Sequence, residues 1–151
     1  MTIKIFSIEK VKKDNYYDII TDYKKMISKY ARVEEYPIFT KEISLAQNMG
    51  SVKAKRSYSE VFEKRMGGYD IALHPGGKMV DSYKFSELLR DRGEVSFFIG
   101  GAYGLEEEFI RKCDFSLSLG PLTMSHKIAK LVLFEQIYRA FTIIHNHPYH
   151  K

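Results

Sequence analysis

Residues 95–104 form the sequence Val-Ser-Phe-Phe-Ile-Gly-Gly-Ala-Tyr-Gly, in which an apolar run ends in three closely spaced glycines. A short apolar run bounded by turn residues is typical of a strand buried on both faces, as in a parallel sheet. Glycine lets a backbone approach a ligand closely and adopt a positive φ angle. The stretch therefore predicts a buried strand followed by a turn suited to a binding site.

Strand and helix patterns alternate on both sides of this stretch, which favours an α/β fold with a parallel sheet. Gly93 stands where a glycine commonly ends a helix, and Thr123 or Ser125 can cap the last helix. From Tyr69 onward the pattern predicts a strand at 69–73, a turn at 74–78, a helix at 82–92, a strand at 95–99, a helix at 105–112, a strand at 115–119 and a helix at 128–144.

The first part of the chain predicts a strand at 3–8, a helix at 15–31 and a second strand at 34–39. Pro37 lies inside that second strand and cannot donate to a ladder, which favours an early end or an edge position. Residues 40–57 have weak periodicity and predict a long loop that carries Lys53, Lys55 and Arg56. Residues 59–66 predict a helix.

Length and composition predict one domain over residues 1–151, because 151 residues with 44% hydrophobic side chains can supply one sizeable core. No stretch approaches the roughly 18 apolar residues of a membrane span, and the apolar run at the start is short for a secretion signal. The lone Cys113 cannot form an internal disulfide, and no paired Cys/His spacing predicts a zinc site. We expect a cytoplasmic protein without a metal.

Positive charge is concentrated in the first part of the chain. The formal net charge is +5, and residues 1–66 hold 14 basic and 9 acidic side chains. Such an excess favours a polyanionic partner, most often a nucleic acid, although a merely solvated basic face fits the same count.

Three loops follow strands that end at the same edge of the predicted sheet, after Leu73, Ile99 and Leu119. Ligands of open α/β sheets bind outside this edge. No GxxxxGK[ST] or GxGxxG fingerprint is present, so a nucleoside or thioether ligand is favoured over a cradled phosphate. The glycines that are expected to shape this crevice are Gly76, Gly77, Gly100, Gly101, Gly104 and Gly120.

Four of the five histidines lie near the C-terminus, at His126, His145, His147 and His150. A cluster beside a ligand crevice favours proton transfer or hydrogen bonding to a polar substrate, although local hydrogen bonding and solvated tail residues explain the same pattern. The ending Tyr-His-Lys at 149–151 can stack on an unstacked RNA base and pair with its phosphates, or simply fray.

The helix at 128–144 is almost continuously apolar, and one small sheet cannot cover all of it. A subunit interface is therefore expected as its second neighbour.

Several motifs closely resemble those of the RlmH family, the large-subunit ribosomal RNA pseudouridine-N3 methyltransferases of the SPOUT class. The resemblance covers essentially the whole chain. The matching runs are Phe-Ile-Gly-Gly-Ala-Tyr-Gly-Leu at 98–105, Leu-Gly-Pro-Leu-Thr-Met-Ser-His at 119–126, Ile-Tyr-Arg-Ala at 137–140 and Asn-His-Pro-Tyr-His-Lys at 146–151.

The resemblance implies a SPOUT-type parallel sheet flanked by helices, with a C-terminal trefoil knot. It also implies a homodimer that uses S-adenosylmethionine to methylate N3 of a pseudouridine in 23S ribosomal RNA, as free RNA or in the ribosome. The family's usual turn is Gly-Gly-Pro-Glu-Gly, and Ala102 and Tyr103 here replace Pro-Glu. The cofactor contacts that it implies are Leu73, Gly100, Leu119, Gly120, Pro121, Leu122, Thr123 and Met124.

A mechanism follows from this resemblance as a hypothesis. His150 is the candidate proton acceptor or base-orienting group, Tyr149 stacks on the base, and Arg139 or Lys151 holds phosphate. Lys53, Lys55 and Arg56 are the candidate RNA-docking residues. Two alternatives are a dimeric RNA-binding protein of the same fold that has lost cofactor binding, and a nucleotide-dependent enzyme of ordinary doubly wound topology.

Overall fold

The computed structural model describes all 151 residues and contains one parallel sheet of five strands, in the order β2-β1-β4-β3-β5. All four strand pairings are parallel, which confirms the predicted α/β class. β2 lies at an edge of the sheet and pairs only with β1. Pro37, which has no backbone N–H to donate, is therefore tolerated in this strand, as the sequence predicts. The strands are β1 (Thr2–Ile8), β2 (Arg32–Ile38), β3 (Tyr69–Met79), β4 (Glu94–Ile99) and β5 (Phe115–Ser118).

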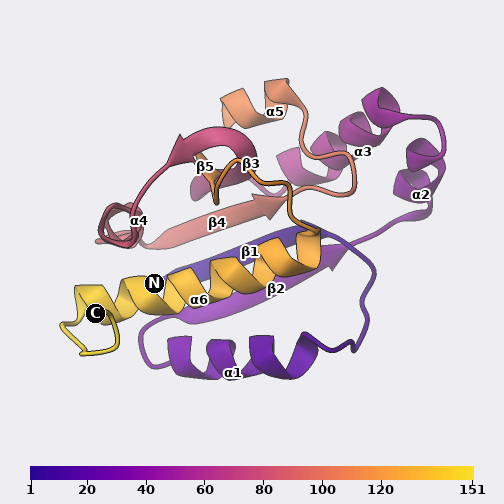
Figure 1. The fold of residues 1–151 in the computed structure, drawn as a ribbon. Helices are drawn as coiled ribbons and strands as arrows, with labels where there is room; N and C mark the ends of the chain where they lie inside the picture. The colour runs from indigo at the N-terminus through magenta and orange to yellow at the C-terminus, as the bar shows by residue number, and fades with distance from the viewer.

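Helices cover both faces of the sheet (Figure 1). α1, α4 and α6 pack on one face, and α2, α3 and α5 pack on the other. None of them is long and apolar enough to cross a membrane. The helices are α1 (Tyr17–Ile27), α2 (Lys41–Gln47), α3 (Ser51–Glu63), α4 (Ser82–Leu89), α5 (Glu107–Lys112) and α6 (His126–Ile144).

The inner strands alternate between two apolar clusters. In β4, Phe97 joins the cluster under α6 and Phe98 joins the cluster under α3, and neither ring is exposed. Fully burying one such ring contributes roughly 1.5–3 kcal/mol, so both faces help to hold this strand at the centre of the sheet. The prediction of a strand buried on both faces is confirmed.

The predicted loop at 40–57 is wrong, because α2 and most of α3 occupy it. The Thr40 side chain caps α2 by accepting the N–H of Ile43 at 3.2 Å. Gly50, with a φ of +104°, separates the two helices. Apolar contacts at Ala54, Tyr58 and Phe62 recur every four residues, but the polar residues between them hide this spacing from pattern analysis.

Two further boundaries differ from the sequence prediction. β3 continues to Met79 with a register shift, so that Leu73 and Lys78 both pair with Leu117 and the predicted turn is a bend inside the strand. Gly93 does not end α4. Asp91 takes the positive φ angle of +58° near that end, a conformation that aspartate tolerates better than most residues.

α6 lies against the sheet with α1 and α4 as neighbours. Figure 1 shows it running across the front of the molecule with α1 beneath it. Much of the apolar surface that predicted a subunit interface is therefore covered within the chain. Ile128 remains 44% exposed near the start of the helix.

Candidate active site

The three strand-end loops converge on one pocket. It is bordered by residues after Leu73, Ile99 and Leu119, as the sequence predicts. The Ser118 hydroxyl joins two of the loops, because it donates to the Pro75 carbonyl at 2.9 Å and accepts the Gly120 N–H at 3.1 Å. The pocket is thus built at the carboxyl edge of the sheet.

Seven of the eight residues implied as cofactor contacts line this pocket, and Pro121 does not. Gly76 and Gly77, which were also expected at the crevice, are not part of the lining. A Cβ atom on Gly77 would lie 2.7 Å from the Ser116 carbonyl oxygen, so this glycine serves close packing against β5. The seven lining residues are Leu73, Gly100, Leu119, Gly120, Leu122, Thr123 and Met124.

The glycine turn after β4 depends on close backbone approaches. A Cβ atom on Gly100 would lie 2.7 Å from the Gly104 carbonyl oxygen, and one on Gly101 would lie 2.5 Å from the Tyr58 hydroxyl. The Gly104 N–H donates to the Gly101 carbonyl at 3.1 Å and closes the turn. Tyr58 is fully buried beneath this turn and donates to the Gln47 side chain, and no sequence motif marks it as part of the site.

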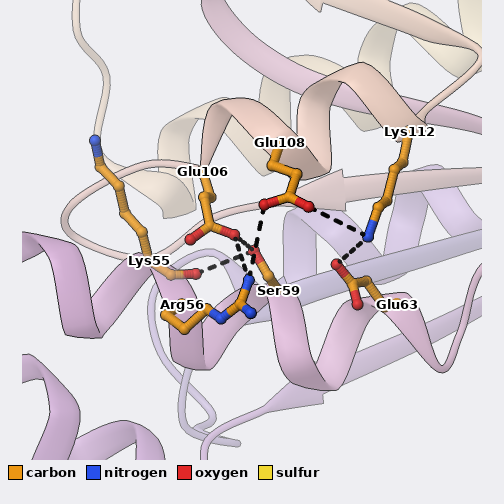
Figure 2. A network of polar contacts seen from close by, with 7 residues as sticks. All are labelled: Lys55, Arg56, Ser59, Glu63, Glu106, Glu108 and Lys112. Atoms are coloured by element: carbon orange, nitrogen blue, oxygen red, sulfur yellow. Dashed lines mark hydrogen bonds and ion pairs between the residues drawn. The ribbon is translucent and has the colours of Figure 1, made fainter.

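A polar network fastens α5, which follows the glycine turn, to α3 (Figure 2). Glu106 accepts from the Ser59 hydroxyl at 3.0 Å and pairs with Arg56 at 3.3 Å. Lys112 pairs with Glu63 at 3.0 Å. These contacts hold α5 against α3. The same helix, α3, carries Tyr58, which packs under the glycine turn.

The start of α6 closes the pocket. Ser125 caps the helix by accepting the Ile128 N–H at 3.3 Å, and His126 and Ala129 line the cavity. Backbone groups of glycines and apolar side chains make up most of the lining. Such walls fit the adenosyl group of S-adenosylmethionine and the aliphatic carbons beside its sulfonium. The crowded positions of Gly100 and Gly101 show that the glycine turn bordering the pocket packs closely against Gly104 and Tyr58.

The C-terminal tail folds back onto α6 and α4. Arg139 Nη1 lies 3.1 Å from His150 Nδ1, and the Tyr149 hydroxyl donates to Glu135 at 3.1 Å. Burial, together with the hydrogen bond to Glu135, raises the pKa of Tyr149 to about 12. Arg139 also donates through Nε to Glu135 at 3.0 Å, and this bond raises the pKa of the guanidinium.

The structure brings Arg139, Tyr149 and His150 together but does not bring them to the pocket of the same chain. The pocket is lined by α6 as far as Ala129, whereas the tail packs beside Arg139. Ten helical residues at about 1.5 Å each separate these positions by roughly 15 Å. Within one chain, the site therefore consists of two separate parts.

The candidate RNA-docking residues lie on α3 and not on a loop. Lys53 is exposed and Lys55 is half-buried. The Arg56 guanidinium pairs with Glu106 and lies 4.0 Å from Glu108, so acidic neighbours already balance its charge. Lys151 is exposed at the end of the chain.

The remaining titratable candidates serve local structure. His145 Nδ1 lies 2.9 Å from the Phe141 carbonyl oxygen, to which it donates, and His147 Nδ1 accepts the Tyr149 N–H at 3.2 Å. Burial, aided by Asp70 and Asp114, raises the pKa of the Cys113 thiol to about 12, so Cys113 is no thiolate nucleophile. No group of three or more His, Cys, Asp or Glu side chains comes together to hold a metal ion.

A parallel α/β sheet with a pocket at its carboxyl edge defines the general class of this protein, and comparison with known proteins identifies its family. Residues 1–150 match the family model described as "Predicted SPOUT methyltransferase", and the chain belongs to this SPOUT methyltransferase family.

Particular relatives are named more specifically. Proteins named "Ribosomal RNA large subunit methyltransferase H" from Aliarcobacter butzleri and Campylobacter jejuni are each 50% identical to the chain over 151 residues, with both chains fully covered. The protein of that name from Sulfurovum sp. is 49% identical over 153 residues, again with full coverage of both chains. A solved structure titled as a probable methylase family protein from Haemophilus influenzae matches with a TM-score of 0.56 at 16% identity, covering 99% of this chain and 70% of that one. That likeness shows the fold.

Proposed function

We propose that the protein is an S-adenosylmethionine-dependent methyltransferase of large-subunit ribosomal RNA, with N3 of a pseudouridine in 23S RNA as the acceptor. The observation that carries this proposal is the pocket at the carboxyl edge of the sheet, in a chain that shares half of its residues with proteins named for this activity. A ribosomal substrate in turn implies the bacterial cytoplasm as the place of action.

The cofactor would lie among the three strand-end loops. When bound, S-adenosylmethionine supplies an activated sulfonium methyl group. Gly100 would contribute backbone groups to the pocket wall, while Leu73, Leu119 and Leu122 offer apolar contacts. Apolar walls and a closely packed glycine turn suit a reaction that depends mainly on positioning.

A homodimer would complete the site, because the tail cannot reach the pocket along its own α6. The partner copy's tail would then meet the pocket of the first chain. Ile128 and Leu122 beside the pocket are 44% and 76% exposed, which offers apolar surface for such a contact. We also propose the trefoil knot of the family for the segment from β5 through α6.

His150 acts on the base chiefly by orienting it. Arginine can only donate hydrogen bonds, so His150 Nδ1 accepts from Arg139. A neutral imidazole with an accepting Nδ1 carries its proton on Nε2, which then donates to a carbonyl oxygen of the base. Of the two roles proposed for His150, the contact with Arg139 favours base orientation over proton acceptance.

Tyr149 and the basic residues take the remaining roles. The Tyr149 ring lies under the Arg139 guanidinium, with 4.8 Å between the guanidinium carbon and the ring centroid, and would stack on the target base. Arg139 and Lys151 would hold phosphate, although Glu135 already balances Arg139. Lys53, Lys55 and Arg56 remain a proposed second contact with RNA.

Two measurements test the function. Isothermal titration with S-adenosylmethionine should show binding, and mass mapping of ribosomal RNA should show one methyl group missing from 23S RNA in cells without the protein. RNA binding without cofactor binding would favour the non-catalytic RNA-binding protein. Cofactor binding with an unchanged RNA modification map would exclude the proposed substrate.

A further inference from the structure

The segment between β1 and α1, residues 9–16, carries Lys10, Lys12 and Lys13, all of which are exposed. It leaves the carboxyl end of β1, beside β4, whose carboxyl end leads into the glycine turn. The chain after β1 continues through α1 on one face of the sheet, and the chain after β4 continues through α5 on the other. Ligands of open α/β sheets bind where neighbouring connections diverge in this way.

A buried ion network anchors this segment to the start of α6. Lys127 pairs with Glu9 at 2.8 Å and with Asp14 at 2.7 Å. Lys130, which is only 5% exposed, pairs with Glu9 at 3.1 Å and with Glu35 at 2.7 Å. The position of the lysine-bearing segment is therefore fixed by side chains that lie below the surface.

The same two turns of α6 also close the cofactor pocket. His126 and Ala129 line the pocket, while Lys127 and Lys130 hold the segment 9–16. Residues three apart lie on one side of a helix, so these two pairs occupy adjacent sides. The segment and the pocket therefore share a wall, and Figure 1 shows α6 beginning at the end of the sheet where the chain leaves β1.

The lysines inside the buried ion network are paired with carboxylates, whereas the exposed lysines of residues 9–16 are not. Lys24 pairs with Glu35 at 3.1 Å, so that three lysines face the three carboxylates of Glu9, Asp14 and Glu35. None of the three exposed lysines forms an ion pair. Lys10 lies 5.2 Å from the Phe39 ring centroid and Lys13 lies 5.3 Å from that of Tyr17, so aromatic rings support their side chains without neutralising them.

We propose that Lys10, Lys12 and Lys13 form a docking site for the phosphate backbone of the ribosomal RNA beside the methylated nucleotide. The inference rests on the proposed function and adds to it a surface that positions the RNA strand at the rim of the pocket. An uncompensated row of lysines on a fixed segment suits phosphates, which fix the register of a nucleic acid on a protein. Lys53 and Lys55 lie on the opposite face of the sheet, on α3.

The test compares the Lys10→Gln, Lys12→Gln, Lys13→Gln triple variant with a matched control. Lys25→Gln, Lys29→Gln, Lys64→Gln removes the same charge from exposed lysines near the C-terminal ends of α1 and α3, at the opposite edge of the sheet. The substrate is large ribosomal subunits from cells that lack the protein. The measurements are the binding affinity across salt concentrations, the KM and kcat of methyl transfer, and the affinity for S-adenosylmethionine.

The triple variant should bind subunits about ten-fold more weakly, and the slope of log affinity against log salt should fall by roughly 2.5, at about 0.7–0.9 for each of the three lost phosphate contacts. KM should rise while kcat and cofactor affinity stay close to those of the wild type. The control variant should keep the wild-type slope.

Three results would count against the docking site. Equal slopes for the triple variant and the control would overturn it while leaving the methyltransferase activity intact. Weaker binding with an unchanged slope would indicate a protein contact instead of phosphate. Wild-type protein that binds cofactor but does not methylate the subunits would overturn the proposed function, and the docking role with it.

Discussion

Arg139 donates a hydrogen bond to Nδ1 of His150 over 3.1 Å, and this contact places the proton of a neutral His150 ring on Nε2. The His150 ring also packs edge-on against Tyr83, with 4.8 Å between the ring centroids. Both contacts fix the direction in which Nε2 points.

The tautomer predicts which substitutions of His150 preserve methyl transfer. The amide nitrogen of a glutamine can take the place of Nε2 as a donor, but it cannot accept a proton. His150→Gln should therefore retain most of the single-turnover rate, whereas His150→Ala should lose about 100-fold or more, as removal of a positioned polar group often does. Equal losses in the two variants would instead assign His150 the role of proton acceptor.

Gly100→Ala should weaken cofactor binding. The added Cβ would lie 2.7 Å from the Gly104 carbonyl oxygen, so the glycine turn must open. We expect at least a ten-fold loss of affinity for S-adenosylmethionine in isothermal titration, and a loss of about 1–3 kcal/mol in the free energy of unfolding. Gly93→Ala is the matched control, because nothing lies within 4 Å of its added Cβ, and it should bind like the wild type. An unaffected Gly100→Ala would remove the turn from the cofactor site.

The pocket was predictable from the sequence because its parts are local. Apolar runs ending in glycine at Gly100 and Gly120 mark strand ends, and the carboxyl ends of parallel strands share one edge. α2 and the start of α3 were missed, because the apolar residues of α3 are spread singly among charged ones. Tyr58 was missed because its role depends on contact with Gly101, 43 positions away in the chain. The Glu9 network was missed because it joins residues 118 and 121 positions apart.

The charges on α3 should contribute unequally to RNA binding. Arg56 is already paired with Glu106, whereas Lys53 and Lys55 form no ion pair. Lys53→Gln, Lys55→Gln should lower the salt slope of subunit binding by about 1.5, and Arg56→Gln should lower it less. Binding measured at several salt concentrations separates the two variants. A wild-type slope in the double variant would remove α3 from the RNA contact.

Glu9 should make the stability of the protein depend on pH in the acidic range. Glu9 is 6% exposed as a residue, and although burial opposes ionisation, the hydrogen bond from Lys127 and the charge of Lys130 outweigh it and lower the pKa of the carboxyl. A carboxyl with a depressed folded-state pKa stabilises the fold above the ordinary glutamate pKa of about 4.3 and loses this contribution as the pH falls through the folded-state value.

Glu9→Gln should therefore lower the free energy of unfolding at pH 7 by about 2–3 kcal/mol. This is less than the ~3–5 kcal/mol lost when an isolated buried pair is broken, because Lys130 keeps Glu35 and Lys127 keeps Asp14. The difference from the wild type should shrink below about pH 4.3, where Glu9 begins to protonate in the unfolded chain. Glu87→Gln, which breaks an exposed pair with Arg90, should cost less than about 1 kcal/mol in urea unfolding. If Glu9→Gln lowers the free energy of unfolding by the same amount at every pH from 7 to 3, the negative charge of Glu9 is not the source of its stabilising effect.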